Sequence, residues 1–85
     1  MQTTTAFAEA VAGEVRAELA ARRLTQANLA KFMRWNTTSL SRILNRPQSM
    51  DLAHLEQIAL YLGITPLQLV TAATARADRT SAAIA

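Results

Sequence analysis

The stretch from Thr25 to Arg46 constrains the fold more than any other part of the chain. Its apolar residues recur at intervals of three and four, which is the spacing of one face of an α-helix. Arg34 and Trp35 interrupt this pattern after about two helical turns. We therefore predict two short helices joined by a tight turn, one from Gln26 to about Met33 and the other from Thr37 to about Asn45.

Helix signals also flank this stretch. The pattern predicts a first helix from about Thr5 to about Arg23, and a fourth helix that is capped by Ser49 or Asp51 and ends near Leu62. The segment 65–68, Thr-Pro-Leu-Gln, combines an N-cap, a proline at the first helical position and a glutamine three residues after the cap, which is typical of a helix start. Because Gly and Pro are few, the sequence predicts an all-α fold, a compact bundle of about five short helices.

The length of 85 residues allows one small domain, which buries about 60–65% of its unfolded surface. We predict a disordered N-terminus over residues 1–5, a domain over 6–74 and a partly helical or frayed tail over 75–85. The chain has no cysteine, so it offers neither a disulfide nor a thiolate metal site. No signal peptide is recognisable, and no segment has the roughly 20 apolar residues that a membrane span needs.

The charge of the chain is unevenly distributed. The net charge is +3, and no Asp or Glu occurs between Leu19 and Met50. That acid-free interval carries six cations: Arg22, Arg23, Lys31, Arg34, Arg42 and Arg46. A cluster of unopposed positive charge favours an anionic partner such as nucleic acid.

The predicted third helix has a polar face opposite its apolar residues. That face comprises Thr37, Thr38, Ser41, Arg42 and Asn45. An arginine can bond guanine O6 and N7 through a bidentate fork, and a threonine can offer thymine a hydroxyl or a methyl group. An ordinary solvated face would more often hold Glu and Lys, because Ser and Thr are poor helix formers. We therefore predict that this helix reads bases in a DNA groove.

Several residues allow two interpretations. Arg22 and Arg23 suit the negative end of the first helix as well as they suit DNA, and Arg22 is also spaced for an ion pair with Glu18. Trp35 is interpreted as a plug in the core rather than a stacking or partner-binding residue. His54 is interpreted as a surface or cap-side histidine, because no nucleophile or metal partner accompanies it in the sequence.

The run LTQANLAKFMRWNTTSLSRILNRPQSMDLAHLEQIALYLGITPLQLV, Leu24 to Val70, resembles the XRE or Cro/CI-like helix-turn-helix proteins of phages and bacteria. The matching elements are the Thr-Gln opening, the Ser-Leu-Ser-Arg-Ile-Leu run of the third helix and the later Leu-Gly-Ile. The resemblance implies a lambda-repressor-like DNA-binding domain that inserts its third helix into the major groove. The implied base-reading residues are Thr37, Thr38, Ser41 and Arg42. The predicted phosphate-binding residues are Gln26, Lys31, Arg34, Asn36, Asn45 and Arg46.

One departure from the family pattern concerns the turn. Arg34 stands where glycine is usual, so either a non-glycine residue adopts positive φ at a cost of about 1 kcal/mol, or the turn is reshaped.

The leading functional hypothesis is a sequence-specific transcriptional regulator of phage or prophage type, either a repressor or Cro-like, bound to a double-stranded DNA operator. The alternative is a DNA-binding antitoxin, or protein-interaction module, of a toxin–antitoxin pair. We expect no enzymatic activity, cofactor, metal or membrane partner, and a location in the bacterial cytoplasm, on the nucleoid when bound. A homodimer is possible through the fifth helix and the tail, with Val70, Ala73 and Ile84, or only on DNA.

Overall fold

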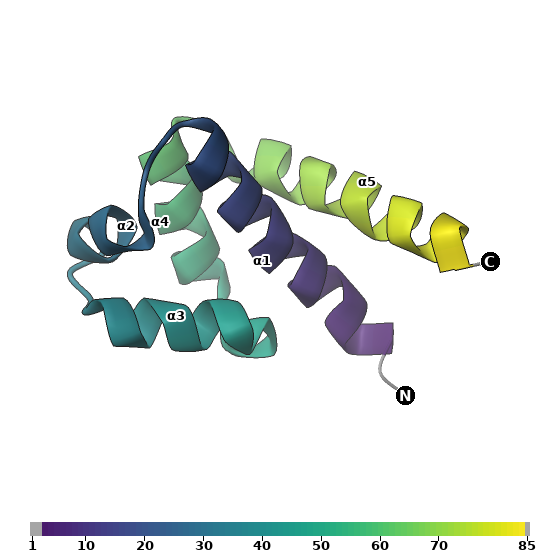
Figure 1. Cartoon of the computed structure of the whole chain (residues 1–85), viewed down its shortest axis with the longest axis horizontal. Coiled ribbons are helices and arrows are strands. Elements are labelled where there is room, and N and C mark those ends of the chain that lie inside the picture. Colours follow the sequence, from purple (N-terminus) through teal and green to yellow (C-terminus); the bar gives the residue numbers. More distant parts are fainter. Residues whose placement is uncertain (1–2, 85) are drawn as a thin grey trace.

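The computed structural model describes residues 3–84, with side chains over residues 6–47 and 49–79. The described residues form five α-helices and one 3-10 turn, which confirms the all-α prediction (Figure 1). The elements in chain order are α1 (Thr3–Ala21), α2 (Gln26–Phe32), α3 (Thr37–Asn45), η1 (Pro47–Ser49), α4 (Leu52–Leu62) and α5 (Pro66–Ile84).

The two terminal helices differ most from their predicted extents. Helix α1 begins at Thr3 rather than near Thr5, so residues 3–5 are helical, and residues 1–2 lie outside the described residues. Helix α5 continues as one helix through Ile84. Its second half is rich in alanine, the strongest helix former, which sustains a helix after the apolar pattern has weakened.

The fold comprises two long helices, α1 and α5, and three short helices, α2, α3 and α4. Helices α1 and α5 form the most extensive helix–helix contact in the described chain, α3 and α4 each contact α1, and α2 packs against α3 and α4 (Figure 1). Helices α2 and α3 contact each other directly. The shared core comprises Ala10, Val11, Ala12, Val15, Leu19, Leu29, Ala30, Met33, Leu40, Leu44, Ile58, Ala59, Leu62, Leu69 and Ala73.

The sequence spacing predicts one apolar stripe on α1 and one on α4, and both are wrong at the helix start. The predicted stripes are Phe7, Val11, Val15 and Leu19 on α1, and Leu52, Leu55, Ile58, Ala59 and Leu62 on α4. Val11, Val15 and Leu19 are buried as the spacing predicts, but Phe7, one turn earlier, is 42% exposed. Leu52, predicted on the inner face of α4, is 82% exposed.

In helix α5 the sequence spacing predicts a stripe of Leu67, Val70 and Ala73 that faces the core or a partner, and of these only Ala73 is fully buried. Leu67 is 73% exposed, whereas Leu69 and Ala73 are fully buried. The buried residues Leu69 and Ala73 are therefore four positions apart, whereas the prediction used the spacing of three from Leu67 to Val70. Because Ala73 is inside the core, it cannot contribute to a self-contact surface, and the side chain of Ile84 lies outside the described residues.

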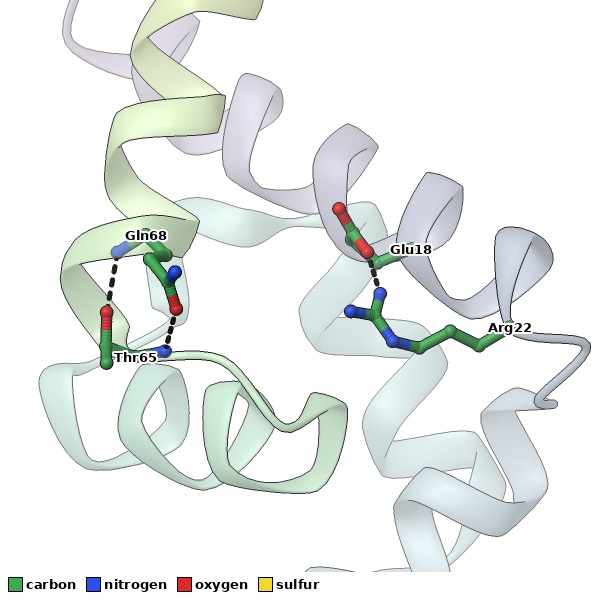
Figure 2. A network of polar contacts seen from close by, with 4 residues as sticks. All are labelled: Glu18, Arg22, Thr65 and Gln68. Atoms are coloured by element: carbon green, nitrogen blue, oxygen red, sulfur yellow. Dashed lines mark hydrogen bonds and ion pairs between the residues drawn. The ribbon is translucent and has the colours of Figure 1, made fainter.

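Side-chain caps fix the helix starts that the sequence predicted. Thr65 and Gln68 form a reciprocal capping box at α5, in which Thr65 Oγ1 accepts from the Gln68 N–H and Gln68 Oε1 accepts from the Thr65 N–H (Figure 2). Asp51, not Ser49, caps α4, because Ser49 belongs to η1. His54 completes the cap of α4 by accepting the Asp51 N–H, which confirms its cap-side position.

Three corners of the chain share one conformation. Each consists of a residue with positive φ, an apolar residue packed against the core and an N-cap or first-turn-capping residue: Arg23-Leu24-Thr25, Arg34-Trp35-Asn36 and Gly63-Ile64-Thr65. The φ angles of the first residues are 57°, 61° and 76°.

The same backbone hydrogen bonds close all three corners. The N–H of the apolar residue donates to a carbonyl five residues earlier, at 2.8 Å from Leu24 to Leu19, 2.8 Å from Trp35 to Ala30 and 3.1 Å from Ile64 to Ala59. A second bond joins the positive-φ residue to the carbonyl three residues before it. This is the Schellman motif, which satisfies helix C-terminal carbonyls and requires a left-handed residue.

Helix α5 crosses α1 at a glycine. A Cβ atom on Gly13 would lie 3.4 Å from Cδ of Arg76, so the glycine leaves room for that side chain to lie across α1. Arg76 Nε reaches Glu14 Oε1 at 3.2 Å, and Glu14 is the buried charged residue of the core region. The absence of a side chain at Gly13 thus permits the close approach of α5 to α1.

Candidate nucleic-acid interface

Helix α3 is oriented by one cap and two core leucines. Asn36 Oδ1 accepts the N–H of Ser39 at 2.7 Å, which satisfies one of the unpaired donors of the first turn. Leu40 and Leu44 are 0% and 2% exposed and hold one side of the helix against the core. The opposite side, which carries Thr38 and Arg42, therefore faces away from the core.

The predicted base-reading residues are not equally accessible. Thr37, Thr38 and Arg42 are exposed, whereas Ser41 is half-buried. The Ser41 hydroxyl donates to Gln26 Oε1 at 3.1 Å, so it connects α3 to the first residue of α2. The sequence did not predict this bond, because the two residues lie 15 positions apart.

Helix α2 carries two of the predicted phosphate-binding residues on different sides. Gln26 begins the helix after the Thr25 cap and is half-buried beside Ser41. Lys31 is exposed, but five residues of helix place it roughly 140° around the axis from Gln26. The structure therefore does not bring Lys31 to the side of α2 that contacts Ser41.

The turn between α2 and α3 contains a non-glycine residue with positive φ, which is one of the two predicted alternatives. Arg34 has φ 61° and an exposed side chain, so the turn keeps the left-handed geometry rather than a reshaped one. Trp35 is half-buried against the core, and its ring meets the His54 ring edge-on, with centroids 4.5 Å apart. That position agrees with its interpretation as a plug beneath the turn.

The C-terminal end of α3 is held by a residue that the sequence analysis missed. Arg16, on α1, donates from Nη2 to the carbonyl of Leu44 at 2.8 Å and to Asn45 Oδ1 at 3.2 Å. Arg46 follows as the exposed C-cap residue of α3. The only sequence signal for Arg16 was its basic charge one turn before Leu19, outside the acid-free interval.

Two hydrogen bonds fix the orientation of the Asn36 and Asn45 side-chain amides. Asn36 Oδ1 faces a backbone N–H, and Asn45 Oδ1 faces a guanidinium, both of which only donate. The amide atom facing each donor must therefore be the oxygen. The NH₂ groups of Asn36 and Asn45 are thus left to donate to another acceptor, which suits an anionic ligand.

Most cations of the acid-free interval are not neutralised. Arg22 forms the predicted ion pair with Glu18 (Figure 2). Among the residues with described side chains, no acid pairs with the other five: Arg23, Lys31, Arg34, Arg42 and Arg46. All five are exposed, so the surface around α2 and α3 is positively charged.

A model of the Cro/C1-type HTH DNA-binding domain matches residues 14–74, which is more than half of the chain. The chain belongs to this family. The match covers α2, the turn and α3, together with α4 and the adjoining halves of α1 and α5. Searches of curated proteins and of solved structures returned no match.

Among the described residues, no three His, Asp or Glu side chains gather in a way that could hold a metal ion. No single described helix is long and apolar enough to cross a membrane, and only α4 with part of α5 meets the length and composition criteria, as a pair bent by 99°.

Proposed function

We propose that this member of the Cro/C1-type family is a sequence-specific transcriptional regulator of phage or prophage type that inserts α3 into the DNA major groove. The observation that carries the proposal is the accessible face of α3, where Thr37, Thr38 and Arg42 project beside unpaired cations. A helix held by its apolar side and exposing Thr and Arg has the chemistry of base readout.

In this proposal the bases and the phosphates are read by different groups. Thr37, Thr38, Ser41 and Arg42 contact base edges. The amides of Gln26, Asn36 and Asn45 and the cations Lys31, Arg34 and Arg46 contact phosphates, of which Lys31 has the least support from its position on α2. Phosphate contacts fix the register of the protein, while base contacts select the sequence.

The setting of this activity follows from the same proposal. Such a regulator acts on operators in the bacterial cytoplasm and associates with the nucleoid when bound. The number of copies on an operator would be reported by the symmetry of the bound sequence, because a symmetric pair of proteins binds a palindrome.

The proposal is tested by selecting bound duplexes from a random DNA library with the whole chain. We expect a defined motif to be enriched, with an affinity that falls steeply as salt rises. Enrichment of no motif, with equal weak binding to all duplexes, would contradict sequence-specific regulation.

Arg42→Ala tests base readout on the enriched duplex. We expect this variant to lose discrimination at one base pair, equivalent to about 1–3 kcal/mol, because a bidentate arginine contact specifies one guanine. Arg46→Ala is the matched control and should weaken binding to all sequences about equally. Uniform weakening by Arg42→Ala, measured by titration against single-base variants of the duplex, would assign it to the backbone instead.

A further inference from the structure

Arg16 connects α1 to the last turn of α3 through two acceptors. Its Nη2 atom lies 2.8 Å from the Leu44 carbonyl oxygen and 3.2 Å from Asn45 Oδ1. The partners are 28 and 29 residues away in sequence, so the contact depends on how α1 packs against α3. Arg16 is nevertheless exposed, so the rest of its guanidinium is accessible to a ligand.

The contact with Leu44 changes the electrostatics of this helix end. The last carbonyls of an α-helix have no intrahelical partners and carry a partial negative charge, which repels a phosphate. A guanidinium on the Leu44 carbonyl satisfies this acceptor and places a full positive charge beside it. The end of α3 at Asn45 is thereby made compatible with an anion.

The contact with Asn45 orients a donor. Because Arg16 can only donate, it holds the oxygen of the Asn45 amide and leaves the NH₂ group for an external acceptor. Arg16 also retains Nε and Nη1, which take part in neither of these two bonds. An accessible amide donor and a cation therefore lie side by side at the end of the exposed face of α3.

We propose that Arg16 and Asn45 form one subsite for a DNA backbone phosphate at the C-terminal end of α3. Asn45 donates its NH₂ group to the phosphate, and Arg16 positions this amide while adding a second, charged donor. The inference rests on the proposed function, since the phosphate is that of the operator, and it adds Arg16 to the residues expected to bind DNA.

The competing explanation is that Arg16 only fastens α3 to α1. In that case the removal of the Arg16 side chain would lower the free energy of unfolding, but it would not change how much DNA affinity is lost when each individual phosphate is neutralised. The readout must therefore be specific to individual phosphates. Duplexes that carry one neutral methylphosphonate at each successive position of the enriched motif provide this readout.

The experiment compares wild type with Arg16→Ala, Arg16→Lys, Asn45→Ala and Asn45→Asp, all as the full chain. Arg79→Ala is the matched control, because it removes one exposed arginine from the part of α5 that lies away from α3 (Figure 1). Folding of each variant is checked by urea denaturation, and affinity is measured on the set of methylphosphonate duplexes.

We expect one methylphosphonate position to weaken wild-type binding about tenfold and to have little further effect on Arg16→Ala or Asn45→Ala. Each of these variants should bind the unmodified duplex about tenfold more weakly, and Arg16→Ala should reduce the salt slope by about 0.9. Arg16→Lys keeps the positive charge but not the several N–H donors of the guanidinium. This variant should therefore recover part of the DNA affinity that Arg16→Ala loses.

Asn45→Asp separates the two explanations. An aspartate keeps the bond from Arg16, or strengthens it, so a purely structural contact predicts an equally stable protein with unimpaired sensitivity to each phosphate. If Arg16 and Asn45 form a phosphate subsite, Asn45→Asp should be folded but bind DNA more weakly than Asn45→Ala, because a carboxylate replaces the amide donor. Asn45→Asp should also recover affinity on the duplex whose methylphosphonate replaces the phosphate of this subsite.

Each outcome has a distinct meaning. If Arg16→Ala and Asn45→Asp remain as sensitive as wild type to every methylphosphonate, this inference is wrong while the proposed function stands. If Arg79→Ala reproduces the change in the sensitivity pattern, the effect is one of overall charge and the inference is also wrong. If the wild-type chain enriches no duplex, the proposed function itself fails.

Discussion

The corner between α2 and α3 and the corner between α4 and α5 have the same backbone but different residues at the position of positive φ. Arg34 occupies it in the first corner with φ 61°, and Gly63 occupies it in the second with φ 76°. In both, an apolar residue follows and donates its N–H back to the preceding helix, from Trp35 in one and from Ile64 in the other.

The difference lies in conformational cost and in charge. A left-handed residue other than glycine costs about 1 kcal/mol, and a Cβ on Gly63 would meet no atom within 4 Å, so conformation rather than space favours glycine there. The corner next to α3 has an arginine at this conformation, as does the α1–α2 corner with Arg23. Both corners beside the proposed DNA surface thus hold a cation at the position of positive φ.

The largest effect is expected from replacing the apolar residue that follows the positive-φ residue in each corner, Trp35 or Ile64. Trp35→Ala should lower the free energy of unfolding by about 2–3 kcal/mol, below the value for a fully buried tryptophan because Trp35 is half-buried. Ile64→Ala should cost about 1–2 kcal/mol. Urea denaturation followed by circular dichroism measures both, and equal losses near zero would show that these residues do not hold the corners.

Exchanging the two positive-φ residues tests the role of the cation. Arg34→Gly should raise the free energy of unfolding by about 1 kcal/mol, and Gly63→Arg should lower it by a similar amount. The double variant keeps the net charge and returns to near wild-type stability.

In the same set of variants, DNA affinity should depend on the presence of Arg34 and not on the residue at position 63. Arg34→Gly and the double variant should bind the enriched duplex more weakly and with a smaller salt slope, whereas Gly63→Arg should bind like wild type. Affinity that depends only on net charge, and is restored in the double variant, would contradict a contact at Arg34.

The smallest expected effect on stability concerns the polar residues that end the corners. Asn36→Ala and Thr65→Ala should each lower the free energy of unfolding by about 0.5–1 kcal/mol, because each removes a cap of the following helix. Only Asn36→Ala should also weaken DNA binding, since the Asn36 amide is proposed to donate to a phosphate. Equal DNA affinity in the two variants would limit Asn36 to capping.

Local sequence signals predicted the starts of α2, α3 and α5. Thr25, Asn36 and the Thr65–Gln68 box mark helix starts through hydrogen bonds that span three residues, so neighbouring residues carry the information. The positive φ of Arg34 was one of two predicted alternatives, and it rested on the family pattern. Arg23 adopts the same conformation without being predicted, because an arginine gives no local sign of a left-handed residue.

Contacts between distant segments were the part that sequence could not supply. The bonds from Arg16 to α3 and from Ser41 to Gln26 depend on how helices pack, not on residue spacing. The prediction that Leu67 is a buried residue of α5 was likewise wrong. Both Leu67 and Leu69 begin plausible apolar stripes, and only the packing of α5 against α1 and α4 selects Leu69. The roles of the exposed α3 residues remain predictions.

The pairing of α1 with α5 sets the order in which the fold can be completed during synthesis on the ribosome. Glu14 and Arg76 lie 62 residues apart, so α1 emerges first but meets its main partner last. A nascent chain that ends at Gly63 already contains α2 and α3, yet the surface of α1 that α5 covers is still exposed. Since domains generally fold as units, we expect the fold to be completed only after α5 has left the ribosome.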